Sequence, residues 1–588
     1  MTSPLAASPL PDDQVALVRR LLAGATAEQR QWLAGYVAGY QAATETRVAT
    51  PGPATAPIAK QPLTILYATE SGNAEALALN VRKAAARGGF AAKVLDMADA
   101  TPADLVGTAN LLVIASTWGE GDPPQRAEAF HAALMATDAP HYEKLNYAVL
   151  ALGDRAYARF CETGRQFDAR FAALGARRIA DLVECDLDYK KTAAGWTETT
   201  LRTLAARAEP AAAVIHVDFA RPVALEAADD APRVANAGII EHINLNSSRS
   251  DRTTCHIALS LTGSGLSYQP GDAIGFVPRN DPALVEDLLR LTGLEADAGM
   301  RTALTQELDI TTLTRAQVST YARLTGAPAL QAIAADDTRF ADFLRDRQVI
   351  DLLEAAPHAL SVAQLTALLR PLPPRFYSVA SSQLAVGEEV HLLVARIDWE
   401  SHGRARHGVA STDLTERRRV GDTLPITVKA NPHFRLPADG ATPVIMIGPG
   451  TGVAPFRAFL QQREASGARG GNWLFFGARR FSHDFLYQLE WQDWLQSGVL
   501  SRIELAFSRD QREKIHVQHR MWQARRDLYA WLRDGAFLYV CGDAKAMAKD
   551  VHAMLLAIIA DQAGKDADAA VAELRALQRA GRYLRDVY

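Results

Sequence analysis

Two apolar segments that lead into loops suited to phosphate binding lie far apart in the sequence, and they require at least two separate α/β units. Residues 63–68 have the apolar character of a buried parallel strand and lead into Thr-Glu-Ser-Gly-Asn-Ala at residues 69–74. Residues 444–447 form a second such run, followed by Gly-Pro-Gly-Thr-Gly-Val-Ala-Pro at residues 448–455. Backbone amides at the start of a helix attract anions, so each loop is a candidate phosphate site. An ordinary strand-to-helix turn is the alternative for the second loop.

The length and composition exclude several classes of protein. A chain of 588 residues is too long for one hydrophobic core and predicts about three or four domains. Its formal net charge of −4 argues against a nucleic-acid-binding face. The start of the chain lacks the pattern of a signal peptide, and no window approaches the ~20 apolar residues of a membrane span. Four widely separated cysteines, without a CxxC pair or zinc spacing, indicate a reducing compartment: Cys161, Cys185, Cys255 and Cys541. We therefore expect a soluble cytoplasmic protein.

The first 48 residues are predicted to be a separate helical segment. Residues 12–43 have the pattern of two helices, and Thr26-Ala-Glu-Gln29 matches a capping box that begins the second one. Residues 49–62 are rich in proline and alanine, which predicts a semi-stiff linker. A helical pair cut off by a linker cannot easily bury its aromatic side chains alone. We therefore expect residues 1–48 to serve oligomerisation or docking, with a frayed tail as the alternative.

Strands alternate with helical stretches through residues 63–207, which predicts a doubly wound parallel sheet. The expected strands are residues 63–68, 92–95, 111–115, 147–151 and 178–182. Ligands of such sheets bind at the carboxyl ends of the strands. Trp118 and Tyr157 lie in two of the strand-end loops and could cover both faces of a flat flavin ring, although each could also be a surface or core residue. Carboxylates near the same rim could steer a basic electron acceptor or could simply be solvated: Glu120, Asp122, Asp154, Glu184, Asp186 and Asp188.

Residues 370–382 lie between the two phosphate loops and are interpreted as a second flavin site. Pro371, Pro373 and Pro374 stiffen the entry to an extended segment. Arg375 offers a planar fork for a pyrophosphate, and Tyr377 offers a flat face for a stacked ring. An edge strand with an exposed arginine is the alternative.

The surrounding sequence supports this interpretation. Segments 238–246, 255–261 and 390–395 are expected to be strands, whereas residues 282–369 have helical periodicity. Residues 408–412 open a helix whose small residues would let a pyrophosphate approach the backbone.

Three strand-end segments in the C-terminal part carry the features of a dinucleotide site. They are residues 476–479, 508–518 and 539–543. Residues 508–518 gather hydroxyl and cationic side chains, which favours a ribose 2′-phosphate and hence NADPH over NADH. Pro455 suits the first turn of a helix that follows the glycine loop.

Taken in order, these motifs resemble the diflavin reductases. Within that family the chain is most similar to the flavoprotein (alpha) component of assimilatory NADPH-sulfite reductases. The matching segments are residues 268–272, 433–437, 472–477, 485–488 and 582–588. The resemblance implies a multidomain α/β and β fold. Its expected parts are a flavodoxin-like FMN domain (63–207), a linker (208–233), a ferredoxin-reductase-like FAD barrel (234–437) with a helical connecting insertion (about 282–369), and a Rossmann-like NADPH domain (438–588).

The resemblance also implies which residues bind the cofactors. The expected FMN residues are Thr69, Glu70, Ser71, Gly72, Asn73, Ala74, Ser116, Thr117, Trp118, Gly119, Leu152, Gly153, Asp154, Tyr157, Phe160 and Cys161. The expected FAD residues are Thr311, Arg375, Phe376, Tyr377, Ser378, Leu393, Val394, Ala395, Trp399, Gly408, Val409, Ala410, Ser411 and Tyr588. The expected NADP residues are Gly450, Thr451, Ser508, Arg509, Lys514, Ile515, His516, Val517, Gln518 and Asp550. Trp399 and His516 each stand where the family more often has a tyrosine.

The same resemblance implies the activity. Ser378, Cys541 and Asp586 match the family's hydride-transfer residues, although Cys541 could instead be a small buried apolar residue. Electrons would pass from NADPH to FAD, to FMN and then to a sirohaem/iron–sulfur haemoprotein (beta) subunit that reduces sulfite to sulfide for cysteine biosynthesis. A separate subunit is implied because this chain has no cysteine cluster for such a centre. The alternatives are a diflavin reductase for another haem acceptor, such as a cytochrome or mono-oxygenase, and a non-catalytic scaffold. No metal site is expected.

Overall fold

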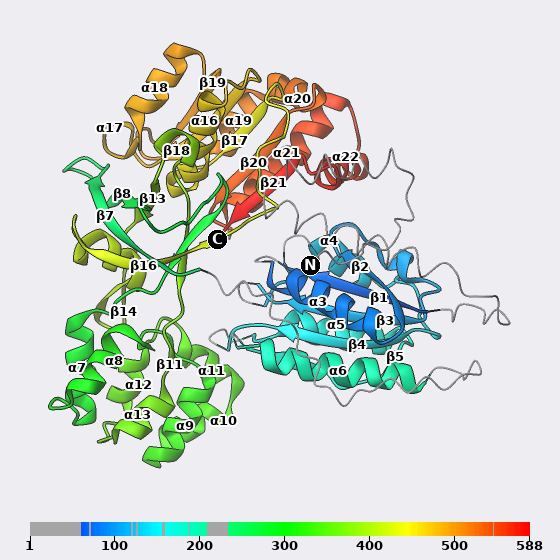
Figure 1. Ribbon diagram of the computed structural model, residues 1–588, viewed down its shortest axis with the longest axis vertical. Helices are drawn as coiled ribbons and strands as arrows, with labels where there is room; N and C mark the ends of the chain where they lie inside the picture. The colour runs from blue at the N-terminus through cyan, green and yellow to red at the C-terminus, as the bar shows by residue number, and fades with distance from the viewer. Residues whose placement is uncertain are drawn as a thin grey trace, which may run out of the picture. The chain divides into compact units, whose positions relative to one another are not determined.

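The computed structural model describes residues 60–69, 72–118, 121–124, 127–155, 159–186, 188–207, 233–544 and 546–588. The predicted N-terminal helices lie outside these residues, as do nearly all of the two predicted linkers, at 49–59 and 208–232. Figure 1 shows the described parts, coloured along the chain.

The first described domain is the predicted doubly wound sheet. Its strand order is β2-β1-β3-β4-β5, which is the flavodoxin-like order. The strands are β1 (Gln61–Ala68), β2 (Phe90–Asp96), β3 (Asn110–Ser116), β4 (Asn146–Leu152), β5 (Arg177–Arg178) and β6 (Val183–Cys185). The predicted strand at 178–182 is wrong. β5 and β6 replace it, and both pair with β4.

Helices cover both faces of this sheet because apolar side chains of the inner strands project to both sides. Helices α3 (Asn73–Arg87) and α6 (Lys190–Ala206) pack on one face, where Leu77 and Trp196 join the core. Helices α4 (Glu128–Met135) and α5 (Glu162–Ala173) pack on the other. A 3-10 turn, η1 (Pro102–Leu105), borders the second face.

The second sheet is antiparallel and forms the predicted barrel. Its order is β12-β9-β16-β7-β8-β13, and Val379 bridges Leu392 between its two edge strands. The strands are β7 (Ala235–Asn244), β8 (Thr254–Ser260), β9 (Ala273–Phe276), β12 (Arg375–Ser378), β13 (Glu389–Ala395) and β16 (Thr423–Lys429). The short helices are α14 (Gln383–Val386), α15 (Val409–Thr412) and η3 (Asp413–Arg417). The helix expected after Gly408 is present: α15 continues without a break into the π-helical η3, and together they span residues 409–417.

A helical insertion separates β9 from β12, as predicted. Its helices are α7 (Pro282–Thr292), α8 (Ala298–Gln306), α9 (Arg315–Thr325), α10 (Pro328–Ala335), α11 (Asp337–Leu344), α12 (Val349–Ala355) and α13 (Val362–Leu368). They share one apolar core and form one cluster in Figure 1. A short ladder, β10 (Leu308–Asp309) with β11 (Arg370–Pro371), lies where the insertion leads back to the barrel. A hairpin of β14 (Asp398–Ser401) and β15 (Arg404–His407) is fixed to α12 because buried Arg406 binds both oxygens of Asp351, at 2.6 and 2.8 Å.

The third sheet is parallel, with the order β19-β18-β17-β20-β21, which matches five strands of the Rossmann order. Its strands are β17 (Val444–Ile447), β18 (Asn472–Ala478), β19 (Arg502–Phe507), β20 (Phe537–Gly542) and β21 (Tyr583–Val587). The 3-10 turn η4 (Gly450–Val453) leads into α16 (Ala454–Ala465), and Pro455 lies in its first turn as predicted. The other helices are α17 (Phe481–Asp484), α18 (Gln488–Ser497), α19 (Val517–Gln523), α20 (Arg525–Arg533), α21 (Met547–Ala563) and α22 (Ala567–Arg579).

The two faces of this third sheet have different helices. Helices α16 and α18 contribute to one core, whereas α19 to α22 contribute to the other. The chain changes direction at β17, which lies between β18 and β20. Such a switch point is where ligands of doubly wound sheets bind. Among the described residues, no helix is long and apolar enough to span a bilayer.

Two glycines of the first domain make a matched test of its packing. A Cβ at Gly164 in α5 would lie 2.3 Å from the Cβ of Ala151 in β4, whereas a Cβ at Gly195 in α6 meets nothing within 4 Å. We expect Gly164→Ala to lower the free energy of unfolding by about 1–3 kcal/mol through overpacking. We expect Gly195→Ala to raise it by about 0.5–1 kcal/mol, because alanine favours the helix.

Hydrogen exchange of the β4 amides is the measurement, because it reports the opening of this domain within the full chain. Faster exchange in Gly164→Ala and slower exchange in Gly195→Ala are expected. Equal exchange in the two variants would contradict the packing of α5 on β4.

Candidate functional site

Three side chains from distant parts of the chain meet at the edge of the barrel. Ser378 ends β12, Cys541 lies in β20, and Asp586 lies in β21. The Ser378 hydroxyl donates a hydrogen bond of 3.0 Å to Oδ2 of Asp586. The Cys541 Sγ lies 4.0 Å from the same oxygen, because Cys541 and Asp586 are register partners in the parallel β20–β21 pair. The structure therefore brings the three predicted catalytic residues together.

The protonation of this group follows from its burial. Burial raises the pKa of the Asp586 carboxyl, while the Ser378 hydrogen bond and the charge of Lys429 act in the opposite direction. Burial also raises the pKa of the Cys541 thiol well above its usual range, and the nearby Asp586 charge adds to this. Cys541 is therefore a neutral thiol at physiological pH, suited to packing beside a ring rather than to nucleophilic attack.

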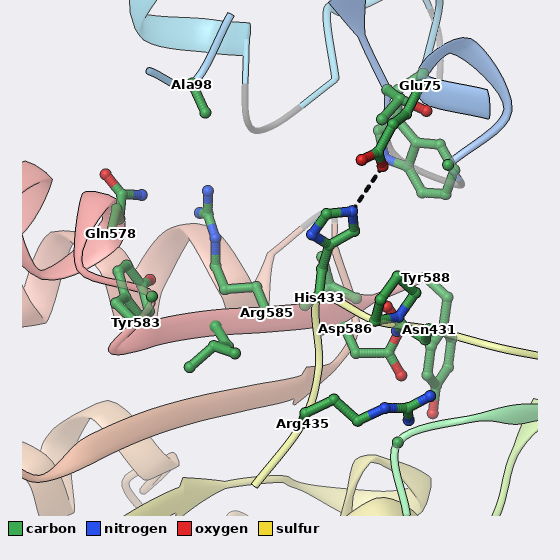
Figure 2. Close-up of a pocket in the computed structure, with 18 of the residues that line it drawn as sticks. Glu75, Ala98, Asn431, His433, Arg435, Gln578, Tyr583, Arg585, Asp586 and Tyr588 are labelled. Carbon is green, nitrogen blue, oxygen red and sulfur yellow. Dashed lines mark hydrogen bonds and ion pairs between the residues drawn. The ribbon is translucent and has the colours of Figure 1, made fainter. Parts of the chain in front are cut away.

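Sequence reasoning missed two members of this site. Asn431 Nδ2 donates to Oδ1 of Asp586 at 3.4 Å, and Lys429 at the end of β16 stabilises the same carboxylate. Figure 2 shows Asn431, Asp586 and Tyr588 close together, with Arg435 beside them. Lys429 and Asn431 directly precede the segment 433–437 that carried the family resemblance. Their position next to that segment could therefore have predicted that they belong to the site, whereas their residue types alone could not.

The segment 433–437 and the turn at 268–272 hold this site from below. Gly271 has a φ of +97°, and a Cβ there would lie 1.9 Å from the carbonyl oxygen of Phe434. Arg435 forms an ion pair with buried Asp272 and donates to the Pro270 carbonyl at 3.1 Å. Only glycine permits this backbone approach, so the two segments fit together as one support.

Tyr588 closes the site from the end of β21. Its backbone N–H donates to the Gly542 carbonyl at 3.0 Å, and its hydroxyl lies 3.0 Å from Oγ1 of Thr451. The side chain is 57 % exposed. Tyr588, a predicted FAD residue, therefore contacts Thr451, a predicted NADP residue.

Two cavities gather most of the predicted FAD residues. One is lined, among other residues, by Arg375, Phe376, Tyr377, Ser378, Leu393, Ala395, Ser411 and Tyr588. A smaller one, of about 210 Å³, is lined in part by Thr311, Gly408 and Val409. Val394 and Ala410 instead belong to the barrel core, and Trp399 lies half-exposed on β14.

The FAD cradle has features that a pyrophosphate would satisfy. Gly408 precedes α15, and a Cβ there would lie 2.5 Å from Oγ of Ser411. Thr412 Oγ1 is buried and has no hydrogen-bond partner among the described residues. This hydroxyl is therefore free to pair with a ligand oxygen. The Arg375 guanidinium donates a hydrogen bond of 3.1 Å to the nearby Pro373 carbonyl. Tyr377 stacks on Phe276, with ring centroids 6.0 Å apart.

The predicted FMN loops meet at the carboxyl ends of β1, β3 and β4. Thr117 N–H donates to the Leu152 carbonyl at 2.9 Å, and its hydroxyl accepts from Thr163 N–H at 3.1 Å. Gly153 N–H donates to the Cys185 carbonyl at 2.9 Å, and Cys161 Sγ lies 3.7 Å from that carbonyl.

The loop between β1 and α3 has features that suit the FMN phosphate. Thr69 Oγ1 is buried and has no partner among the described residues, and Gly72 caps α3 with a φ of +82°. Asn73 and Ala74 form the first turn of α3, so their amides face the same end. Ser116 ends β3, Trp118 begins a turn with Asp122, and Phe160 carries Arg155 over its ring at 5.0 Å. Four predicted residues lie outside the described residues: Glu70, Ser71, Gly119 and Tyr157.

The carboxylates of the same rim are partly neutralised. Glu184 forms an ion pair with Arg165 at 2.5 Å, and Asp186 lies 3.8 Å from Arg155. Burial raises the pKa of Cys161 to about 12, with the Glu184 charge as a second cause. The net negative charge of the rim is therefore smaller than a count of its carboxylates alone would indicate.

The predicted NADP residues lie around the switch point of the third sheet. Gly450 has a φ of +57° and precedes Thr451 in η4. Ser508 and Arg509 follow β19, with their N–H groups on the carbonyls of Ala478 and Arg479 at 3.0 and 2.8 Å. Lys514 and Ile515 follow in the same loop, and His516 precedes α19, whose first residues are Val517 and Gln518. Gln518 Nε2 donates to Asp550 at 2.9 Å, which brings these two predicted residues together.

Three family models match the chain. A flavodoxin model matches residues 65–196, an FAD binding domain model matches residues 227–335 and 298–412, and an oxidoreductase NAD-binding domain model matches residues 446–553.

Among curated proteins, the chain is similar to a Bacillus subtilis protein, with 41% identity over 99% of both chains. A Vibrio parahaemolyticus protein is 38% identical over 100% of this chain and 96% of its own. A Cronobacter sakazakii protein is 40% identical over 100% of this chain and 99% of its own. All three are named sulfite reductase [NADPH] flavoprotein alpha-component.

The raised pKa of Asp586 gives a test of the site's electrostatics. Its folded pKa lies above its unfolded value, so its contribution to stability is complete below the unfolded pKa and is lost as the pH rises through the folded pKa. We expect Asp586→Asn to raise the denaturation midpoint at neutral pH, because the charged carboxylate is no longer buried. Denaturant titrations at several pH values are the measurement. Near pH 3 the two proteins should have the same midpoint, and a gain that persists there would contradict this cause.

Proposed function

Because the chain belongs to the family of NADPH-sulfite reductase flavoprotein alpha-components, we propose that it passes electrons from NADPH through FAD and FMN to a separate sirohaem/iron–sulfur haemoprotein (beta) subunit. That subunit would reduce sulfite to sulfide and so support cysteine biosynthesis. The observation that carries the proposal is the convergence of Ser378, Cys541 and Asp586 next to the bridge between Tyr588 and Thr451.

The cofactor sites would divide as follows. Thr69 and the start of α3 would hold the FMN phosphate, whereas Arg375 and the residues after Gly408 would hold the FAD pyrophosphate. Ser508 and Arg509 would hold the NADPH 2′-phosphate. When bound, the nicotinamide and the flavins supply the hydride and electron transfer.

The side chains of the site would contribute by positioning. The Ser378 hydroxyl donates a hydrogen bond to Asp586, and this bond fixes the position of the hydroxyl oxygen at the end of β12. Cys541 is fully buried and keeps its proton, so its thiol fills a defined volume without acquiring charge. Asp586 orients both groups. Exact placement of the reacting atoms accounts for a large share of catalysis in such steps.

Tyr588 would act as a gate over this site. Its hydroxyl contacts Thr451, and its ring must leave that position before a nicotinamide can reach Ser378 and Cys541. Because the side chain is more than half exposed, its displacement costs little buried apolar area.

The proposed organisation extends to the domains and the assembly. The proposed domains 63–207 and 438–588 contain the flavodoxin and NAD-binding matches, whereas the FAD binding domain match begins at residue 227, before the proposed start at 234. Residues 1–48 would drive homo-oligomerisation. A cytoplasmic location is supported by Cys161, Cys185, Cys255 and Cys541, all of which are buried free thiols.

Flavin content and reconstitution test the function. We expect one FAD and one FMN per chain after release from the purified protein, and NADPH-dependent sulfide formation only when the haemoprotein subunit is added. Both flavins without sulfite-dependent turnover would favour another haem acceptor, whereas a colourless protein would favour a scaffold.

Replacement of Cys541 tests the site itself. We expect Cys541→Ala to slow the single-turnover reduction of FAD by NADPH roughly tenfold or more, because a misplaced ring loses positioning. Nucleotide affinity should be unchanged. Cys255→Ala is the matched control, since Cys255 is also a buried free thiol but lies in the barrel core. An unchanged rate in Cys541→Ala, measured by stopped-flow bleaching of the flavin, would remove the proposed role.

A further inference from the structure

A carboxylate from the barrel lies between two arginines of the third sheet's domain. Asp251 belongs to the loop between β7 and β8. Its Oδ2 lies 2.8 Å from Nη1 of Arg479 and 3.5 Å from Nη1 of Arg509. Arg479 follows β18 and Arg509 follows β19, so the carboxylate lies at the carboxyl ends of two adjacent parallel strands.

Hydrogen bonds to residues of α17 hold the loop that carries Asp251. Asn246 Nδ2 and Ser250 Oγ both donate to Oδ1 of buried Asp484, at 3.0 and 2.6 Å. Ser247 N–H donates to the His483 carbonyl at 3.0 Å. Three hydrogen bonds thus hold this barrel loop against α17, and they place Asp251 directly over the arginines.

The cluster carries more positive charge than Asp251 neutralises. Arg252 also lies beside it, and the pKa of Arg252 is lowered by burial and by the nearby charge of Arg479. Two guanidinium groups thus contact the Asp251 carboxylate, and the charge of Arg252 adds to theirs, although Asp398 also acts on Arg252. Guanidinium groups bind carboxylates and phosphates with the same paired geometry. A phosphate dianion would balance the charge of the cluster better than Asp251 alone.

We propose that Asp251 is an internal counter-ion that occupies the 2′-phosphate position of Arg479 and Arg509 when no nucleotide is bound, and so limits the affinity for 2′-phosphorylated nucleotides. The inference rests on the proposed function, in which Ser508 and Arg509 hold the 2′-phosphate. Binding must then exchange the Asp251 contacts for phosphate contacts, and release restores them. Asp251 acts through the arginines and is a positioning residue. Its consequence is a weaker nucleotide complex that exchanges faster.

Calorimetric titration of the holoprotein with 2′,5′-ADP and with 5′-ADP tests this. The two nucleotides carry the same number of phosphates and differ in where one is attached. We expect Asp251→Asn to bind 2′,5′-ADP roughly three- to tenfold more tightly, because one like charge near the phosphate is removed. Binding of 5′-ADP should not change. Asp251→Glu, which keeps the charge, should resemble the parent protein.

A matched control is available on the same domain. Asp527 is similarly exposed and pairs with Arg502 at 2.7 Å, away from the switch point. Asp527→Asn therefore makes the same change in net charge and should leave both affinities unchanged. Unchanged or weaker binding of 2′,5′-ADP by Asp251→Asn would overturn the inference, and so would an equal gain for both nucleotides. If the parent protein itself does not prefer 2′,5′-ADP to 5′-ADP, the proposed NADPH site fails instead.

Discussion

The hydrogen bond between Ser378 and Asp586 joins the barrel to the last strand of the third sheet, and the geometry of the site depends on it. A carboxylate in this half-buried position is tolerated only while donors surround it. Ser378 and Asn431 supply donors from the barrel and Lys429 adds a nearby positive charge, whereas the carboxylate itself comes from β21. Relative movement of the two sheets would leave the charge without its partners. The site therefore opposes separation of the domains that build it.

A second polar network, remote from the site, fixes the same two domains. Arg457 in α16 donates to the Ala380 carbonyl of the barrel and to Glu490 of α18, both at 2.7 Å. His256 in β8 lies 2.9 Å from the Tyr487 hydroxyl, and burial lowers the pKa of His256 to about 3. The histidine is consequently neutral at physiological pH, so it adds no charge beside the buried arginine. Directional hydrogen bonds here hold the domains in one relative orientation more strictly than apolar packing would.

Local sequence patterns were sufficient for most of the strands and for the helix that follows β17. β3 and β4 are apolar on both faces, and Pro455 marks the start of α16, so these elements could be predicted from single segments. The strand at 178–182 could not. Arg177 and Arg178 are exposed at the edge of the sheet and pair only with β4 among the described strands. With one neighbouring strand and no buried side chains, the strand ends after two residues.

The functional residues depended on contacts that no local pattern contains. Ser378 and Asp586 are separated by most of the third domain, so their meeting was implied only by family resemblance. Lys429 and Asn431 were missed because a single lysine or asparagine after a strand has no distinctive spacing. The pairing of Asp251 with Arg479 and Arg509 likewise depends on how the barrel loop lies on another domain. Contacts between side chains of different domains leave no local pattern, so they cannot be predicted from a single sequence.

The four buried cysteines have a practical consequence for studies of motion in this molecule. Burial raises the pKa of every one of them, to about 12 for Cys161 and about 11 for Cys185. Alkylating reagents require an accessible thiolate, so labelling of the native protein must wait for local opening. Cys161 and Cys185 lie in the first sheet's domain, Cys255 in the barrel and Cys541 in the third sheet. Each of the three sheet domains thus contains at least one natural thiol whose alkylation rate reports local opening. Comparing these rates would rank how often each domain opens.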